Sequence, residues 1–493
     1  MSGTDIHSGS WAKSIFRVGK WYVLASLLVK GINGLTLPIF TNYMSPAEMG
    51  IYTGINSLKA FLPLIISIGL DAAFIRFFHE YKKDSLKLKE MFSSTFWLVM
   101  LLGTFSCIIL YFVFKSSYPQ YDPVSIALVI FPPILYQLGM LGIVFFNQSL
   151  ESYKTTLFQI SATIVGVGCS IYFVAVRDMG VQGRLLGDSF IAVLLMAMVT
   201  YYFASRKILS FTFNWSYIKQ ALIFSLPLLP VSIAAWINTQ SSVLLVQKFY
   251  PGQDLAGLFG LATSVSVLMY YAIDAITQVL NPVVMSGLIN DRERTHTKIR
   301  DLMMMFTVAI LFIHLLIIYF SKEIVIIFTA NAGEFQNAHI YIAPLCVAYM
   351  FGIYHRLFNT IISFHKKNIY ITYAVILGAV AVFSSNFVLL PVYGPKIAAL
   401  SQIIGTLIMV GIEFYFARRL ENVKFGLHRY IKFIVLYALA AILFYLCLNI
   451  DEHFWVILIL KIAVVICIGI AFIYFGNYTA ALKDFVKRKL KLN

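Results

Sequence analysis

Two lysines lie deep inside apolar stretches of the sequence, where a cation needs a special environment. Lys30 stands in LLVKGINGLTLPIF (27–40), ten residues before a short loop at 41–50, and Lys59 stands nine residues after that loop. At 1.5 Å per helical residue, both lie about 14–15 Å from the membrane boundary that the loop marks, near the bilayer centre. A lysine that faces lipid at this depth costs at least about 2.5–3.5 kcal/mol. The two lysines therefore predict a water-filled cavity with a positively charged lining.

Uncharged polar residues occur at an equivalent depth in a later stretch. An offset of 207 aligns VKGINGLT (29–36), which contains Asn33, with WINTQSSV (236–243), which contains Asn238 and Gln240. Both helices could bend or break at the glycines and prolines nearby, which are Gly31, Gly34, Pro38, Pro227 and Pro230. Small and polar residues also line ordinary helix–helix contacts in membranes. The cluster therefore has two interpretations, a cavity wall or helix packing.

Acidic residues inside the apolar stretches are candidates for ion coupling. Asp274 lies about eighteen residues into its stretch, without an obvious local cation, so its carboxyl could bind H⁺ or Na⁺. Asp71 precedes Arg76 closely, and we expect a local salt bridge between them. His314 is expected to be a hydrogen-bonded packing residue.

The remaining charged groups in apolar stretches favour structural roles. His355, Arg356 and Glu413 lie toward the cytoplasmic ends of their stretches, where long side chains can reach the interface. For Lys461 two interpretations stay open, because it could reach outward to the interface or mark a lateral groove.

The composition places these residues in a membrane protein. Of the 493 residues, 60% are hydrophobic and 12% are charged, about half the charged share of a soluble protein. Because a span needs about 20 apolar residues, the sequence predicts an all-α membrane protein with fourteen transmembrane helices. The predicted spans are 21–40, 51–75, 92–114, 124–147, 156–176, 185–205, 221–247, 256–288, 302–329, 339–363, 369–391, 396–417, 430–449 and 454–476.

The distribution of Lys and Arg gives the orientation. Loops on the side of the two termini hold 28 of the 38 basic residues, and the alternate loops hold 6. Since cytoplasmic loops are rich in Lys and Arg, both termini are expected to be cytoplasmic. The net charge of +16 is then explained by these loops and by anionic lipids, and no nucleic-acid partner is expected.

Weak internal similarity predicts two repeats. YMSPAEMGIYT (43–53) aligns with YPGQDLAGLFG (250–260), and a segment at 179–207 aligns with one at 393–420. We expect an N-terminal six-helix half (1–208), a second half (209–421), and two further helices with a basic tail (422–493). Six helices are an even number, so both halves enter the membrane in the same sense and would flank a central cavity.

The sequence lacks common motifs of nucleotide-binding proteins, hydrolases and metal sites. It contains no GxxxxGK[ST], HExxH or GxSxG, and its five cysteines form no metal-binding spacing. We therefore expect neither a catalytic residue nor a metal or other cofactor.

Several segments resemble a known family. LPIFTNYMSPAEMGIYTGINSL (37–58), GLDAAFIRFFHEYK (69–82) and FSLPLLPVSIAAWINTQSSVLLVQKF (224–249) are similar to segments of the Wzx-type flippases. These are translocases of lipid-linked oligosaccharides in the multidrug/oligosaccharidyl-lipid/polysaccharide exporter superfamily. Family members often carry an acidic–basic pair in the seventh helix, where this chain has Gln240, Ser241 and Ser242.

The resemblance implies a transporter rather than an enzyme. Its substrate would be an undecaprenyl-pyrophosphate-linked oligosaccharide for O-antigen or another surface polysaccharide, and a polymerase and a chain-length regulator would be partners beside the membrane lipids. Lys30 and Lys59 would attract the pyrophosphate, and Asp274 would couple transport to H⁺ or Na⁺. The sugars would contact the polar and aromatic residues Asn33, Asn238, Gln240, Tyr270 and Tyr271.

Two other functions remain open from the sequence. An ion-coupled MATE-like exporter of cationic small molecules would favour acidic residues in its cavity. A membrane glycosyltransferase or polymerase would need a substantial periplasmic loop, and the longest outward loop here (330–338) is short.

Overall fold

The computed structural model describes residues 31–32, 34–117, 122–251, 254–330, 333–423, 428–447 and 454–475. Throughout these ranges the regular structure is helical. The predicted all-α membrane fold is therefore correct. Lys30 and Asn33 lie outside the described residues, as do the side chains of Tyr271 and Asp274.

The chain packs as two units. Unit 1 comprises residues 1–260 and 328–332, and unit 2 comprises 261–327 and 333–493. The predicted repeats, 1–208 and 209–421, are a relation of sequence, which this division by packing does not test. They stay a prediction.

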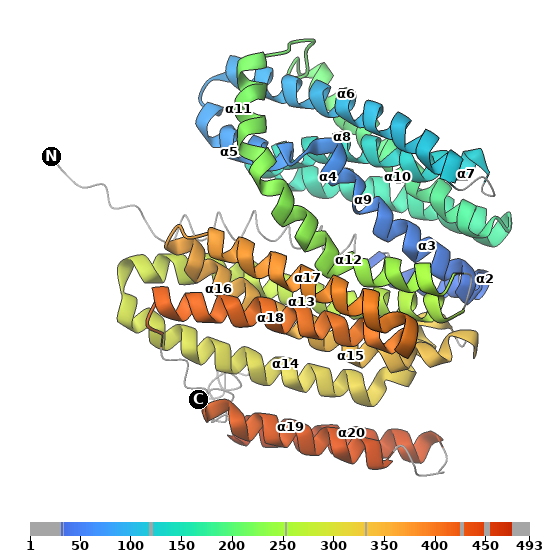
Figure 1. Ribbon diagram of the computed structural model, residues 1–493, viewed down its shortest axis with the longest axis vertical. Coiled ribbons are helices and arrows are strands. Elements are labelled where there is room, and N and C mark those ends of the chain that lie inside the picture. Colours follow the sequence, from blue (N-terminus) through green and yellow to red (C-terminus); the bar gives the residue numbers. More distant parts are fainter. Residues whose placement is uncertain are drawn as a thin grey trace, which may run out of the picture. The chain divides into compact units, whose positions relative to one another are not determined.

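Helices α2 to α12 belong to unit 1 (Figure 1). Their bounds, with a π-helical turn η1 and a 3-10 turn η2, are α2 Leu37–Tyr43, α3 Pro46–Lys59, α4 Leu62–Ser67, α5 Leu70–Tyr81, α6 Ser85–Ser117, α7 Pro123–Ile130, α8 Pro132–Gln148, α9 Ser152–Ile171, η1 Tyr172–Val176, α10 Gly180–Ser205, α11 Trp215–Ser225, η2 Leu226–Leu228 and α12 Leu229–Phe249.

The later helices belong to unit 2, apart from the first turns of α13 and the end of α14. Their bounds, with a 3-10 turn η3, are α13 Asp254–Asn290, α14 Arg292–Thr329, η3 Gly333–Ala338, α15 His339–Met350, α16 Gly352–Phe364, α17 Ile369–Tyr393, α18 Lys396–Leu420, α19 His428–Cys447 and α20 Phe454–Phe475.

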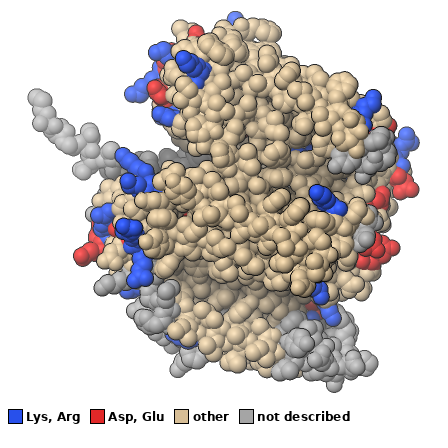
Figure 2. Space-filling model, viewed as in Figure 1, with Lys and Arg blue, Asp and Glu red and all other residues tan. Residues whose placement is uncertain are grey.

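Ten described helical segments are long and apolar enough to cross a membrane, and three shorter apolar helices accompany them. Each predicted span from the second to the fourteenth overlaps one of these thirteen, while most of the first lies outside the described residues. Large apolar side chains such as Leu101 and Phe105 of α6 are 63% and 64% exposed, as a lipid-facing surface requires. On the face shown in Figure 2, charged side chains stand mostly near helix ends, with apolar and neutral surface between them. The chain is thus a multi-pass membrane protein, and the count of fourteen stays a prediction.

An aromatic cluster forms the centre of unit 1. Phe74 on α5, Phe92 on α6, and Phe146 and Phe203 on α8 and α10 are all fully buried. The rings of Phe92 and Phe203 stack with their centroids 4.4 Å apart. The hydrophobic effect does not drive helices together within lipid. Close packing of these rings therefore helps to hold the four helices together.

Glycines allow two pairs of helices to approach closely. A Cβ atom on Gly166 of α9 would lie 2.8 Å from the carbonyl oxygen of Gly187 on α10, and one on Gly187 would lie 2.7 Å from that of Gly166. In unit 2, a Cβ atom on Gly405 of α18 would lie 2.8 Å from the carbonyl oxygen of Gly378 on α17. Small residues at such contacts are typical of helix pairs in membranes.

Two helices of unit 1 are broken side by side. Between α4 and α5, Ile68 and Gly69 take the left-handed φ values of 49° and 72°, which is costly for a β-branched residue. A Cβ atom on Gly69 would lie 3.4 Å from the Cβ atom of Ser225, where α11 ends and η2 begins. The predicted break at Pro227 is confirmed, whereas the break at Ile68 and Gly69 was not predicted.

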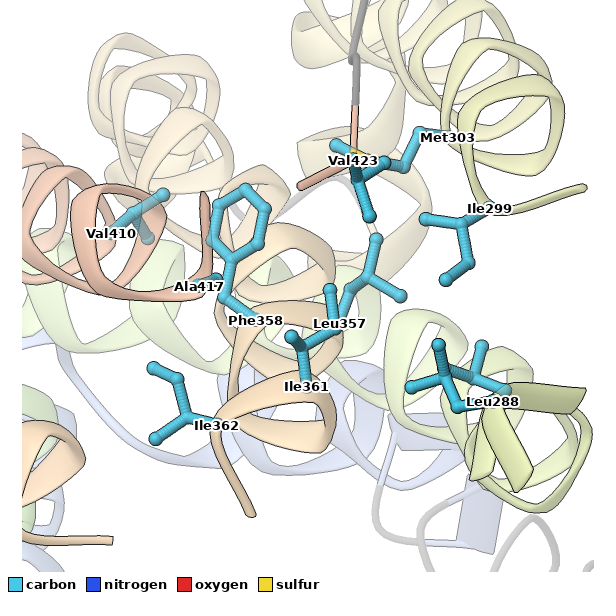
Figure 3. Packing of buried hydrophobic residues seen from close by; sticks show 11 residues of the cluster. Leu288, Ile299, Met303, Leu357, Phe358, Ile361, Ile362, Val410, Ala417 and Val423 are labelled. Atoms are coloured by element: carbon cyan, nitrogen blue, oxygen red, sulfur yellow. The ribbon is translucent and has the colours of Figure 1, made fainter. Parts of the chain in front are cut away.

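Unit 2 has a separate apolar core, in which Leu357, Phe358 and Ile361 of α16 pack against α13, α14 and α18 (Figure 3). A second cluster, around Tyr319 of α14 and Phe433 of α19, attaches the last two helices. The Tyr319 hydroxyl donates to the carbonyl oxygen of Ala440 at 2.8 Å, so this attachment is specific as well as apolar.

Candidate functional site

Lys59 forms an ion pair inside unit 1. Its Nζ atom lies 2.7 Å from Oδ2 of Asp188, which is on α10. The hydroxyl of Tyr52 donates to the same carboxylate, at 3.2 Å to Oδ2. The side chains of Lys59 and Asp188 are 15% and 22% exposed, so the pair is largely but not fully enclosed.

Helices α3 and α10 begin at the same level and together position this ion pair. Ser45 and Glu48 form a capping box that starts α3, and Pro46 occupies its first position. Glu48 lies against Gly180, the first residue of α10. Both helices therefore begin at one level, and Asp188 lies about 12 Å along α10. Lys59 is the last residue of α3, and because helical side chains point back toward the N-terminus, its ammonium group reaches the level of Asp188.

Arg184 adds a second cation one turn before Asp188. Its guanidinium carbon lies 3.7 Å from the ring centroid of Phe40 and 5.0 Å from that of Tyr52. These are cation–π contacts, which leave the five N–H donors of the guanidinium available. Among the residues that the structure describes, no carboxylate lies within 4.0 Å of it. Lys59, Arg184 and Asp188, called the α3–α10 cluster below, therefore carry a net charge of about +1 at neutral pH.

The sequence analysis predicted Lys59 as a cavity cation and missed Asp188 as its partner. Asp188 carries a signal that could have revealed it, because it is a carboxylate inside the predicted span 185–205. The predicted role of Lys59 in substrate binding stays a proposal, and it now includes an ion pair.

The polar cluster of α12 partly satisfies itself. The hydroxyls of Thr239 and Ser241 donate to carbonyl oxygens of their own helix, at 3.1 and 2.6 Å. Asn238 and Gln240, the predicted sugar-binding residues, are half-buried. Trp236 ties α12 to α3, because its indole N–H donates to the carbonyl oxygen of Ser57 at 3.0 Å.

Unit 2 gives Tyr270 a cationic partner. The guanidinium of Arg356 donates to the Tyr270 hydroxyl at 2.7 Å. Beside Arg356 in sequence, His355 lies 2.9 Å from the carboxylate of Glu413, whose side chain is 0% exposed. The expectation that Glu413 reaches the cytoplasmic interface is wrong, because its side chain is fully buried where α16 and α18 pack together.

Three other predictions about buried charges have clear outcomes. Asp71 accepts a hydrogen bond from Gln137 at 2.7 Å instead of pairing with Arg76, whose guanidinium lies over the ring of Phe224. His314 is 2% exposed and contacts the hydroxyl of Tyr437 and a backbone carbonyl, as predicted for a packing residue. Lys461 is bound to Glu323 at 2.6 Å, which accounts for its position without a lateral groove.

The described residues contain no group of three or more His, Cys, Asp or Glu side chains that could hold a metal ion.

Comparison with known proteins places the chain in a family. Residues 11–332 match the family described as polysaccharide biosynthesis protein. The chain belongs to this family. It is 25% identical over 295 residues to the succinoglycan biosynthesis transport protein ExoT of Rhizobium meliloti (strain 1021), a match that covers 57% of this chain and 56% of that protein. The chain thus matches just over half the length of this relative.

The fold is shared with solved membrane transporters. A structure of the lipid II flippase MurJ in an inward closed conformation matches with a TM-score of 0.74 at 16% identity, covering 94% of this chain and 99% of that one. An inward-facing MATE family transporter of the MOP superfamily matches with a TM-score of 0.57 at 15% identity, covering 82% of this chain and 99% of that one. These identities are low, so the structural matches establish the fold alone. The predicted resemblance to a polysaccharide family is confirmed, because the family match places the chain among polysaccharide biosynthesis proteins and the fold is that of the solved flippase and MATE structures.

Proposed function

We propose that the protein is a flippase that moves an undecaprenyl-pyrophosphate-linked oligosaccharide from the cytoplasmic to the periplasmic leaflet by alternating access. Membership of a polysaccharide biosynthesis family is the observation that supports this most. ExoT is named a transport protein and MurJ a flippase, and both names fit a transporter rather than an enzyme. The product would serve O-antigen or another surface polysaccharide, with a polymerase and a chain-length regulator downstream.

The charge of the α3–α10 cluster suits this substrate. A pyrophosphate moved through bare hydrocarbon would incur a prohibitive loss of solvation. Lys59, together with Lys30, would supply positive charge against that loss, and lysine binds phosphate as a point charge. Asn33, Asn238, Gln240, Tyr270 and Tyr271 would contact the sugars, and Asp274 would couple the cycle to H⁺ or Na⁺. The protein would lie in the bacterial inner membrane with both termini in the cytoplasm.

The test is the loss of each lysine in cells. Lys59→Ala and Lys30→Ala, at normal membrane levels, should accumulate lipid-linked oligosaccharide on the cytoplasmic leaflet and lose surface polysaccharide. Lys59→Arg and Lys30→Arg should retain more transport, because they keep the charge. Lys322→Ala removes an exposed lysine and serves as the matched control. Normal surface polysaccharide in both alanine variants would contradict the proposal.

A MATE-like exporter is the second candidate, since MATE transporters share the fold. Drug sensitivity of a deletion strain with unchanged polysaccharide would favour that function. A polymerase would instead leave single repeat units transferred to the final acceptor, whereas loss of a flippase leaves none.

A further inference from the structure

Lys59 is paired with Asp188 and is therefore not a free cation in the absence of substrate. The ammonium group is 2.7 Å from the carboxylate, and Tyr52 steadies the same carboxylate from α3. Separating an enclosed ion pair of this kind is costly unless another group replaces the lost partner, because each charge would otherwise remain buried and uncompensated. Any anion that binds Lys59 must therefore compete with Asp188.

A second partner for Asp188 stands on its own helix. Arg184 lies four residues before Asp188, so the two side chains share one face of α10. Arg184 is now stacked against Phe40 and Tyr52, with no described carboxylate within ion-pair distance. If Asp188 were displaced from Lys59, Arg184 could take up its charge without a change in either helix.

We propose that Asp188 is an exchangeable counter-ion of the transport site. A phosphate-bearing lipid headgroup displaces Asp188 from Lys59, Asp188 turns to Arg184 while the headgroup is bound, and it returns to Lys59 when the headgroup leaves. This inference rests on the proposed function. Asp188 keeps Lys59 compensated in the empty state, weakens headgroup binding, and assists release.

The size of the effect follows from the population of the ion pair. If Lys59 is paired with Asp188 in about nine-tenths of the molecules, only about one-tenth of the molecules are competent to bind the headgroup. Removal of the carboxylate then makes all of them competent and tightens binding about tenfold. The same change removes the group that assists release, so transport should slow although binding improves. A purely structural ion pair would not produce this opposition.

The experiment measures binding of undecaprenyl pyrophosphate to the full-length protein in nanodiscs of phosphatidylcholine, with undecaprenol as the uncharged lipid. Asp188→Asn should bind undecaprenyl pyrophosphate about tenfold more tightly, leave undecaprenol binding unchanged, and lower transport in cells. In a Lys59→Ala background, Asp188→Asn should change the affinity by less than about twofold. Asp301→Asn, which removes the exposed carboxylate beside Arg300, is the matched control and should change nothing. Unchanged or weaker binding by Asp188→Asn, or an equal gain without Lys59, would overturn the proposal.

Arg184 provides an independent test if Asp188→Asn does not fold. Arg184→Gln keeps the pair between Lys59 and Asp188 but removes the alternative partner, so undecaprenyl pyrophosphate should bind several-fold more weakly. In the Asp188→Asn background the same substitution should have little effect, because no carboxylate then needs Arg184. Unchanged binding by Arg184→Gln alone refutes the exchange, and so does an equal loss in both backgrounds, since Arg184 would then contact the headgroup directly.

The proposed function and the role of Asp188 can be refuted separately. If the native protein binds undecaprenyl pyrophosphate no better than undecaprenol, the proposed function fails and this inference fails with it. If native binding depends on Lys59 but Asp188→Asn does not tighten it, only the role of Asp188 is refuted.

Discussion

Glu421 lies just beyond the end of α18 and joins three segments of unit 2, so its substitution gives a quantitative test of the structure. Its carboxylate is 3% exposed and accepts hydrogen bonds from Nε2 of His296 at 2.6 Å and Nε2 of His365 at 2.7 Å. Nε of Arg292 lies 2.9 Å away. Burial alone would raise the pKa of Glu421 above its ordinary 4.5, but the hydrogen bonds from the two histidines and the charge of Arg292 outweigh it and lower the pKa.

Glu421→Gln should destabilise the protein by about 2–4 kcal/mol at neutral pH. A hydrogen bond to a charged group contributes about 1.5–3 kcal/mol, and the glutamine amide turns a donor toward groups that also donate. Arg292 adds little, because it is 55% exposed. In a chain of this length the loss corresponds to a melting temperature lower by about 2–4 °C.

The dependence on pH has a definite sign. A carboxyl whose pKa is lower in the folded protein contributes its full stability above the unfolded pKa, and this contribution disappears as the pH falls through the folded pKa. The difference in melting temperature between the native protein and Glu421→Gln should therefore shrink as the pH falls below about 4.5. Thermal unfolding of the detergent-solubilised protein measures both, with Glu293→Gln, an exposed residue at the start of α14, as the control. Equal melting temperatures at pH 7, or a difference that does not shrink at all as the pH falls below 4.5, would refute the assignment.

Two further substitutions test the packing of each unit. Gly166→Val should prevent the close approach of α9 and α10 and reduce folded protein in the membrane severalfold, whereas Gly168→Val on the same helix, where a Cβ atom would meet nothing within 4 Å, should be tolerated; equal yields would contradict the close contact. Lys461→Met should destabilise unit 2 by about 3–5 kcal/mol, because it leaves Glu323 enclosed without its cation, and the double variant with Glu323→Gln should recover much of the loss in melting temperature. A double variant no more stable than Lys461→Met would show that the pair is not what matters.

Hydropathy predicts most of the fold because a chain in lipid can adopt few backbone structures. A backbone in hydrocarbon must satisfy its own hydrogen bonds, so long apolar stretches become helices. Pro227 signals its own break, because its ring prevents a regular helix, and η2 follows there. The break at Ile68 and Gly69 has no such signal, since an isolated glycine is common inside transmembrane helices. Gly69 lies against Ser225, a neighbour that is brought there only by folding of the unit.

Pairing of buried charges is the part that the sequence could not predict. Lys59 and Asp188 are 129 positions apart, and Lys461 and Glu323 are 138 positions apart. No periodicity relates such residues, because their contact depends on which helices are neighbours and on their register. Proximity in sequence predicted the wrong partner for Asp71, because Asp71 accepts a hydrogen bond from Gln137 of α8 instead of pairing with Arg76.

The two lysine pairs show how a structural ion pair differs from a functional candidate. Lys461 and Glu323 are 7% and 18% exposed, and their charges cancel. Lys59 and Asp188 are 15% and 22% exposed, and Arg184 beside them leaves an excess positive charge. A closed neutral pair in a membrane needs nothing further, whereas an excess charge is costly unless water or an anion compensates it. It is therefore this residual charge, rather than the presence of a lysine in a transmembrane helix, that makes the α3–α10 cluster the candidate site for an anionic substrate.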